Sequence, residues 1–234
     1  MGIIMKKAFL ICATCLMALT LRAEDNGPKV EYVDLGVSVK WATCNIGASK
    51  PEGFGDYYAW GETEPYYDSL DPLTWKDSKD EGYKWSSYSW CNEGEYTGLT
   101  KYNTDSKYGI VDNKTVLEET DDVARVKIGG SWRIPTDAEW TELRTQCEWA
   151  KITQNGVIGF RVTSKINGNS IFLPAAGYRS SRSLNGDETG GYYWSSSVDT
   201  EFPYTAWRVF INADGVCRCN LNRYVGISVR PVTE

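Results

Sequence analysis

Residues 129–140 read GGSWRIPTDAEW, and this stretch says most about the fold. Two glycines and a serine form a turn, and the following residues, up to Pro135, favour an extended chain. Thr136 with Glu139 three positions later is a capping box, the pattern that begins a helix. We therefore expect a helix over 137–147, because one face repeats apolar side chains at helical spacing, namely Trp140, Leu143 and Cys147.

The segments on both sides of this helix predict strands and turns. Downstream, turns such as Asn167-Gly168 and Asp214-Gly215 separate short runs of β-forming residues, so we expect strands at 157–163, 170–173, 192–197, 206–212 and 225–229. Upstream, the pattern predicts two strands within 32–41, one at 57–60 and a short helix at 120–126. Residues 61–109 show no hydrophobic periodicity, and we expect them to form a long ordered loop. The predicted fold class is α+β, with one or two helices on a mostly antiparallel sheet.

Composition excludes several classes of protein. The 234 residues contain no histidine, so His-based triads and His-ligated zinc are excluded. A net charge of −6 argues against a nucleic-acid partner, which needs a basic face. Ten Trp, 15 Tyr and 6 Phe argue for a folded chain rather than a disordered one.

The first 23 residues have the layout of a secretory signal peptide. Lys6 and Lys7 precede an apolar run over 8–21, and Ala23 offers a small residue for cleavage. We expect residues 1–23 to be the signal peptide, 24–30 a linker and 31–234 a single domain. A buried N-terminal helix and a lipid-anchored form, which Cys12 or Cys15 would carry, are the alternatives. The expected location is therefore extracellular, on the cell surface or periplasmic, without a membrane span.

Export permits disulfides, and removal of the signal peptide leaves five cysteines. An odd number leaves one thiol unpaired, so at most two bridges form. We favour Cys44 with Cys147, because this pairing closes a long loop. Cys217 and Cys219 lie on one face of a strand and are interpreted as small apolar core residues.

Several longer motifs lead to a family. Beside residues 129–140, these are VDLG at 33–36, VKWATCN at 39–45, GDYYAWGET at 55–63, LTKYN at 99–103, VDNK at 111–114, LPAAGYR at 173–179, GYYWSSS at 191–197 and GISVRPV at 226–232. Together they cover nearly all of the mature chain. The chain resembles the Fibrobacter succinogenes major paralogous domain family of secreted Bacteroidetes proteins.

This resemblance implies a C-type-lectin-like fold with long ordered loops, in the branch that contains formylglycine-generating enzymes and the variable proteins of diversity-generating retroelements. It further implies that residues 192–230 display ligand-contacting side chains on a fixed scaffold. The scaffold itself would include Thr136, Glu139, Trp140, Trp194 and Arg230.

The first functional hypothesis is a non-enzymatic module that binds an extracellular protein or glycan, with a role such as adhesion. In the strand at 206–212, Trp207, Val209 and Ile211 share the inward face, which leaves Arg208 and Phe210 outward. Tyrosine and arginine supply large contact area and hydrogen bonds. The expected ligand-contacting residues are Tyr204, Arg208, Phe210, Asn220, Asn222, Arg223 and Tyr224.

Two other functions are weighed against this one. A formylglycine-generating oxidase uses a C-terminal cysteine pair five positions apart, whereas Cys217 and Cys219 are two apart. A carbohydrate-binding or glycan-processing protein would stack sugars on tryptophans of the long loop, which otherwise pin that loop to the core: Trp75, Trp85 and Trp90. Hydrolysis would also need two carboxylates, for which the chain offers Glu62, Glu64, Asp68 and Asp71.

Calcium is the one cofactor that the sequence brings into consideration. The chain lacks the Glu-Pro-Asn, Gln-Pro-Asp and Trp-Asn-Asp triplets of calcium-dependent lectins. A structural calcium site is conceivable in the oxygen-rich segment that contains Asn103, Asp105, Asp112, Asp121 and Asp122, and otherwise these are turn and N-cap residues. We expect no cofactor for function.

Overall fold

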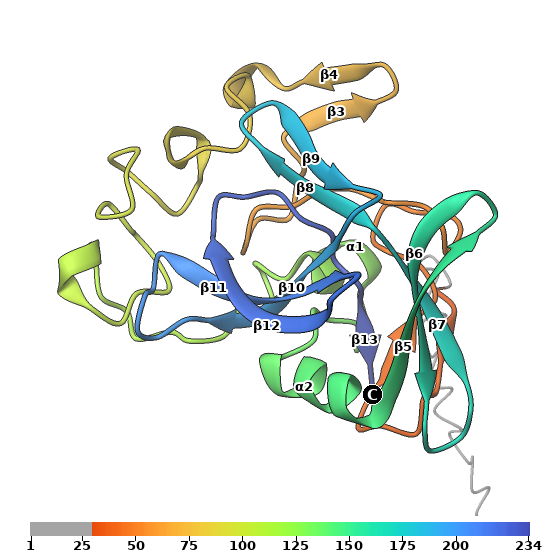
Figure 1. Ribbon diagram of the computed structural model, residues 1–234. Coiled ribbons are helices and arrows are strands. Elements are labelled where there is room, and N and C mark those ends of the chain that lie inside the picture. The colour runs from red at the N-terminus through yellow and green to blue at the C-terminus, as the bar shows by residue number, and fades with distance from the viewer. Residues whose placement is uncertain (1–29) are drawn as a thin grey trace, which may run out of the picture.

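The computed structural model describes residues 30–234 (Figure 1). The expected signal peptide, 1–23, and nearly all of the expected linker, 24–30, lie outside the described residues and stay predictions. The described chain is α+β and mostly strand, with two α-helices, in agreement with the class predicted from the sequence. Within residues 30–234 no helix is both long and apolar enough to cross a membrane.

Antiparallel strand pairs make up most of the described fold. One sheet has the order β1-β2-β13, which joins the two ends of the described chain: β1 (Tyr32–Val33), β2 (Lys40–Ala42) and β13 (Val232–Thr233). A second contains β5 (Cys147–Gln154), β6 (Val157–Ser164) and β7 (Ser170–Pro174). The third, which carries the candidate site, contains β10 (Gly191–Val198), β11 (Thr205–Asn212) and β12 (Gly215–Asn222). Two hairpins complete the set: β3 (Tyr67–Leu70) with β4 (Leu73–Trp75), and β8 (Ala176–Ser180) with β9 (Ser183–Asp187).

Helix α2 (Asp137–Gln146) confirms the prediction from the capping box. The Thr136 hydroxyl accepts a hydrogen bond of 3.2 Å from the Glu139 amide, and the Glu139 carboxylate accepts one of 2.7 Å from the Thr136 amide. Trp140 is buried, and its indole nitrogen donates to the carbonyl of Trp194 at 3.1 Å. The cap therefore places α2 under the β10–β12 sheet, where Figure 1 shows it.

Helix α1 (Val123–Ile128) begins three residues later than predicted. The reason is its N-cap, because Asp122 accepts hydrogen bonds from the amides of Ala124 and Arg125. The other oxygen of Asp122 accepts from the Ile134 amide at 2.8 Å, which ties the helix to the chain before α2. Burial raises the pKa of the Asp122 carboxyl, although these three amides act against the shift.

The long segment 61–109 is ordered, as predicted, but it contains short regular elements. Besides β3 and β4 it holds three 3-10 turns, η1 (Asp77–Lys79), η2 (Trp85–Ser87) and η3 (Ser106–Tyr108). Its tyrosines form a buried aromatic cluster, in which the rings of Tyr66 and Tyr83 stack at 4.2 Å. Trp75, Trp85 and Trp90 pack against this cluster, so the loop is held by aromatic burial rather than by long strands.

Seven strands were absent from the sequence prediction, namely β3, β4, β5, β8, β9, β12 and β13. The predicted strand at 57–60 is wrong, because only Tyr58 makes a single bridge there, and the predicted strand at 225–229 does not form a ladder either. Instead this segment is buried and makes single bridges to three others, through Gly226, Ile227 and Ser228. It is apolar because it crosses the core, which is why its composition indicates a strand. Arg230 follows it, fully buried, and donates to the carbonyls of Ala42, Thr43 and Phe172.

Candidate functional site

The β10–β12 sheet has two faces with different roles. Val209 and Ile211 are buried against the α2 side, as predicted. Trp207, expected beside them, is only half-buried, and the guanidinium of Arg218 lies over its ring at 3.4 Å from the centroid. Arg208 and Phe210 project from the opposite face, toward the β8–β9 hairpin. That opposite face carries the candidate site.

Arg208 lies among aromatic rings on this face. Its guanidinium carbon is 4.8 Å from the ring centroid of Tyr192 and 5.3 Å from that of Phe210. Tyr178 of β8 packs on Tyr192 at 5.0 Å, so the rings continue across to the hairpin. We call these four residues, Tyr178, Tyr192, Arg208 and Phe210, the arginine face.

The guanidinium of Arg208 has unused hydrogen-bonding capacity. Its Nε and Nη1 are buried and have no partner among the described residues. Burial lowers the pKa of Arg208 to about 10, and the nearby tyrosines oppose this shift only in part. A buried donor without an acceptor costs free energy, so such groups mark places where water or a ligand supplies the acceptor.

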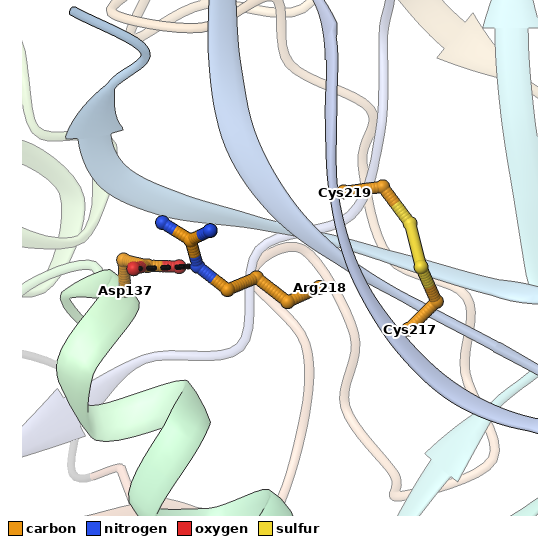
Figure 2. Close-up of a disulfide and its surroundings, with 4 residues drawn as sticks. All are labelled: Asp137, Cys217, Arg218 and Cys219. Carbon is orange, nitrogen blue, oxygen red and sulfur yellow. Dashed lines mark hydrogen bonds and ion pairs between the residues drawn. A yellow bond between two sulfur atoms is a disulfide. The ribbon is translucent and has the colours of Figure 1, made fainter.

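The cysteines differ from the expected pairing. Cys44 and Cys147 are free, and the disulfide instead joins Cys217 and Cys219 on β12 (Figure 2). Cys147 points into the core beneath α2, where burial raises the pKa of its thiol to about 11. Cys217 is exposed and Cys219 half-buried, so the reading of this pair as core residues is also wrong.

The disulfide borders the arginine face. Cys219 lies opposite Arg208 in the β11–β12 register, and Cys217 lies opposite Phe210. Figure 2 shows the intervening Arg218 on the other side of the strand, where its Nε is 2.7 Å from Oδ1 of Asp137. Alternate residues of β12 therefore have different roles: one side of the strand carries the disulfide, and the other side anchors the strand to α2.

Arg223 is the clearest error in the predicted contact set. It is fully buried, whereas the sequence suggested an outward residue. Its guanidinium donates to the carbonyls of Lys101, Tyr102 and Pro203 and to the hydroxyl of Tyr88. Arg223 is therefore part of the scaffold.

The remaining predicted residues fall into separate groups. Tyr204 belongs to an aromatic cluster, with ring centroids 5.2 Å from both Tyr96 and Tyr108 and 6.0 Å from Phe202. Tyr96 and Phe202 are 44% and 38% exposed, so this cluster reaches the surface. Sequence reasoning missed Tyr96, because it lies in the aperiodic loop about a hundred residues upstream of Phe202 and Tyr204.

Asn220, Asn222 and Tyr224 do not join the arginine face through β12. Asn220 lies opposite Trp207 on the other side of the sheet and donates to Asp199 at 2.6 Å. Asn222 lies opposite Thr205 at the end of the strand. Tyr224 packs edge-on against Trp85 of the long loop at 5.0 Å. Of the predicted residues, the structure thus brings together Arg208 and Phe210. It adds Tyr178 and Tyr192 to the site, two residues whose aromatic side chains could have suggested them from the sequence.

The oxygen-rich segment is occupied by internal contacts. Asp112 accepts hydrogen bonds from the amides of Tyr102, Asn103 and Lys114, and Asp122 caps α1. Asp105 caps η3, and Asp121 binds Lys101 at 2.6 Å. Within residues 30–234 no group of three or more carboxylates or thiols is arranged to hold a metal ion. These residues have the turn and N-cap roles that the sequence also allowed.

The acidic residues named for hydrolysis are dispersed. Asp68 and Asp71 are exposed on the β3–β4 hairpin, whereas Glu62 is buried under the long loop. Glu64 pairs with Lys127 at 2.9 Å and with Lys76 at 3.7 Å, and the hydrogen bond from Lys127 lowers the pKa of its carboxyl. Glu62 and Glu64 line one cleft together with Trp90.

Comparisons with known proteins give no match for this chain: no family model, no curated protein and no solved structure is significantly similar.

Proposed function

We propose that this protein is an exported, non-enzymatic binding module with a C-type-lectin-like fold, and that it contacts an extracellular protein or glycan through the arginine face. The resemblance to the secreted Bacteroidetes family supports the fold and the export. The antiparallel sheets and the long ordered loop are of the kind that this fold requires.

One observation carries the proposal. The half-buried Arg208 holds a charged group beside two aromatic rings, and two of its nitrogen donors are buried without a partner among the described residues. An arginine in such a setting matches a ligand that brings a carboxylate or several oxygen acceptors, because guanidinium–carboxylate bonds are strong and directional. The rings of Tyr192 and Phe210 supply contact area around that polar centre.

The aromatic cluster at Tyr204 extends the proposed contact surface. Tyr96 and Phe202 present partly exposed rings around Tyr204, which lies in the connection between β10 and β11. Aromatic side chains are over-represented among residues that dominate binding energy. A protein ligand would use both regions, whereas a small glycan would use the arginine face alone.

A formylglycine-generating activity is less well supported. That chemistry uses cysteines five positions apart, and the two cysteines here are two apart and joined to each other. The glycan alternative belongs to the same proposal, because an acidic glycan supplies the carboxylate that Arg208 requires.

The test uses a glycan array that includes sialylated and uronate-containing glycans, together with a pull-down from intact host cell surfaces. We expect the wild-type protein to bind, and Arg208→Ala to reduce affinity at least about tenfold, the effect of one charged hydrogen bond. Arg218→Ala is the matched control, since Arg218 lies on the other side of β12, and it should retain full binding. Equal binding by wild-type and Arg208→Ala protein would place the contact surface elsewhere.

A further inference from the structure

The cleft that Glu62, Glu64 and Trp90 line lies under the long loop and shares no lining residue with the arginine face. Its volume is about 460 Å³, within the range of small-molecule sites. Four segments form its walls: the chain after Trp60, the 3-10 turn η1 with Lys76 before it, the residues around Trp90, and Thr120 with Asp121. The residues that line it include Gly61, Glu62, Lys79, Ser89, Trp90 and Asp121.

Glu62 offers this cleft a fixed hydrogen-bond acceptor. Its Oε1 accepts from the Tyr66 hydroxyl at 3.0 Å, the Ser89 amide at 2.7 Å and Lys79 Nζ at 3.4 Å. Its Oε2 has no donor among the described residues and is not enclosed by them. The side chain is otherwise buried and lines the cleft, so one oxygen is held in place while the other is left without a donor from the described residues.

Trp90 provides an apolar wall that cannot rotate freely. Its indole nitrogen donates to the Gly61 carbonyl at 2.9 Å, and Lys101 Nζ lies 4.8 Å from the ring centroid. Lys101 is in turn held by Asp121 at 2.6 Å. The indole plane is thereby fixed at the edge of the same cleft that Glu62 faces.

The charges around the cleft compensate one another. Glu62 is paired with Lys79, Asp121 with Lys101, and Glu64 with Lys76. A charged ligand gains little from such a site, whereas a neutral ligand with hydroxyl groups can accept from the lysines and donate to the free carboxylate oxygen. An aromatic wall beside polar groups suits a ring with one apolar side.

We propose that this cleft binds a neutral pyranose sugar, which donates a hydroxyl to Oε2 of Glu62 and stacks its apolar ring face on Trp90. The site is independent of the proposed function, because it uses neither Arg208 nor the β10–β12 sheet. Glu62 and Trp90 act here as binding residues.

The experiment titrates the full exported chain with glucose, galactose, mannose, N-acetylglucosamine, lactose, maltose and cellobiose. Binding is followed by the shift of the Trp90 indole NMR signal, assigned with a Trp90→Leu variant. We expect at least one sugar to bind with a Kd below about 10 mM and to move the Trp90 signal but not the Trp85 signal. Glu62→Gln replaces the free acceptor by an amide donor and should weaken binding at least about tenfold.

Matched variants in the same loop separate the site from general damage. Trp85→Leu and Glu81→Gln remove a tryptophan and a carboxylate that do not line the cleft, and both should bind as the wild type does. Arg208→Ala should also leave neutral-sugar binding unchanged, so that the two proposals fail separately. If none of the seven sugars moves the wild-type Trp90 signal, the proposal is overturned, whatever the variants do. Sugar binding that Glu62→Gln leaves intact, in a folded variant, also overturns it.

Discussion

Arg223 Nε donates a hydrogen bond of 2.9 Å to the hydroxyl of Tyr88, although the two residues lie 135 positions apart and both are buried. The Tyr88 hydroxyl donates onward to the Trp60 carbonyl at 2.6 Å. The guanidinium also lies 5.0 Å from the Trp60 ring centroid. A single cation therefore ties the end of the C-terminal sheet to the long loop.

Arg223→Met should destabilise the protein by about 3 kcal/mol or more, since it leaves three buried carbonyls and one tyrosine hydroxyl without their donor. Urea unfolding followed by circular dichroism measures the difference. Arg218→Ala serves as the control, because its pair with Asp137 and its contact with the Trp207 ring are partly exposed and are together worth about 2 kcal/mol at most. Similar losses in the two variants would contradict a scaffold role for Arg223.

Substitution of Arg208 should have the opposite effect on stability. Its buried Nε and Nη1 lack partners, so the unliganded protein bears a desolvation cost that Arg208→Met removes. We expect the free energy of unfolding of Arg208→Met to equal or exceed that of the wild type by up to about 2 kcal/mol, while binding to the arginine face is lost. Urea unfolding without ligand, next to a binding assay, measures both quantities. A loss of stability as large as that of Arg223→Met would mean that Arg208 supports the fold.

The cysteine assignment can be checked by alkylation in denaturant and mass spectrometry. Without reductant, Cys44, Cys91 and Cys147 should be modified, and reduction should add Cys217 and Cys219. Serine at both positions 217 and 219 should cost less than about 2 kcal/mol of unfolding free energy, because the bridge closes a loop of only three residues. Protection of Cys44 and Cys147 before reduction would restore the pairing favoured from the sequence.

Sequence reasoning succeeded where the signal is local. The capping box at Thr136 and Glu139 predicted α2 because its hydrogen bonds join residues three apart. Alternation in the strand at 206–212 put Arg208 and Phe210 on one face, since the side-chain period of a strand is fixed.

Sequence reasoning failed where the burial of a residue depends on segments that are distant in the sequence. Arg223 is buried by loop carbonyls more than a hundred residues upstream, at Lys101 and Tyr102, and no local pattern reports them. Loop-closure entropy favoured the bridge between Cys44 and Cys147, but it carries no information on which side chains meet. The tryptophans of the long loop show the same limit, because only the folded loop separates Trp90, at a cleft, from Trp85 beside Tyr224.

The buried tyrosines make the fold sensitive to alkaline pH. Burial raises the pKa of Tyr193 to about 12, and burial likewise raises the pKa values of Tyr57, Tyr66, Tyr83 and Tyr88 above their ordinary range. An unfolded tyrosine ionises near pH 10, so the stability that each neutral hydroxyl provides is complete below about pH 10 and is lost as the pH rises from there toward the folded-state pKa. Arg208 and Arg230 act in the opposite direction, because burial lowers their pKa values and their charges are costly in the fold, but they are two groups against these five tyrosines.

We therefore expect cooperative unfolding between about pH 10 and 12, with each such tyrosine costing about 1.4 kcal/mol per pH unit. The tyrosinate absorbance of the buried tyrosines and the far-ultraviolet circular dichroism, recorded on the same samples, should change together, because the buried hydroxyls can ionise only when the chain opens. Tyr32→Phe is the control, since Tyr32 is 53% exposed and its removal should leave the midpoint unchanged. If the tyrosinate signal were complete while the circular dichroism stayed native, the aromatic cluster of the long loop would have to be open to hydroxide in the folded protein, and the fixed plane of Trp90 beside it would lose its support.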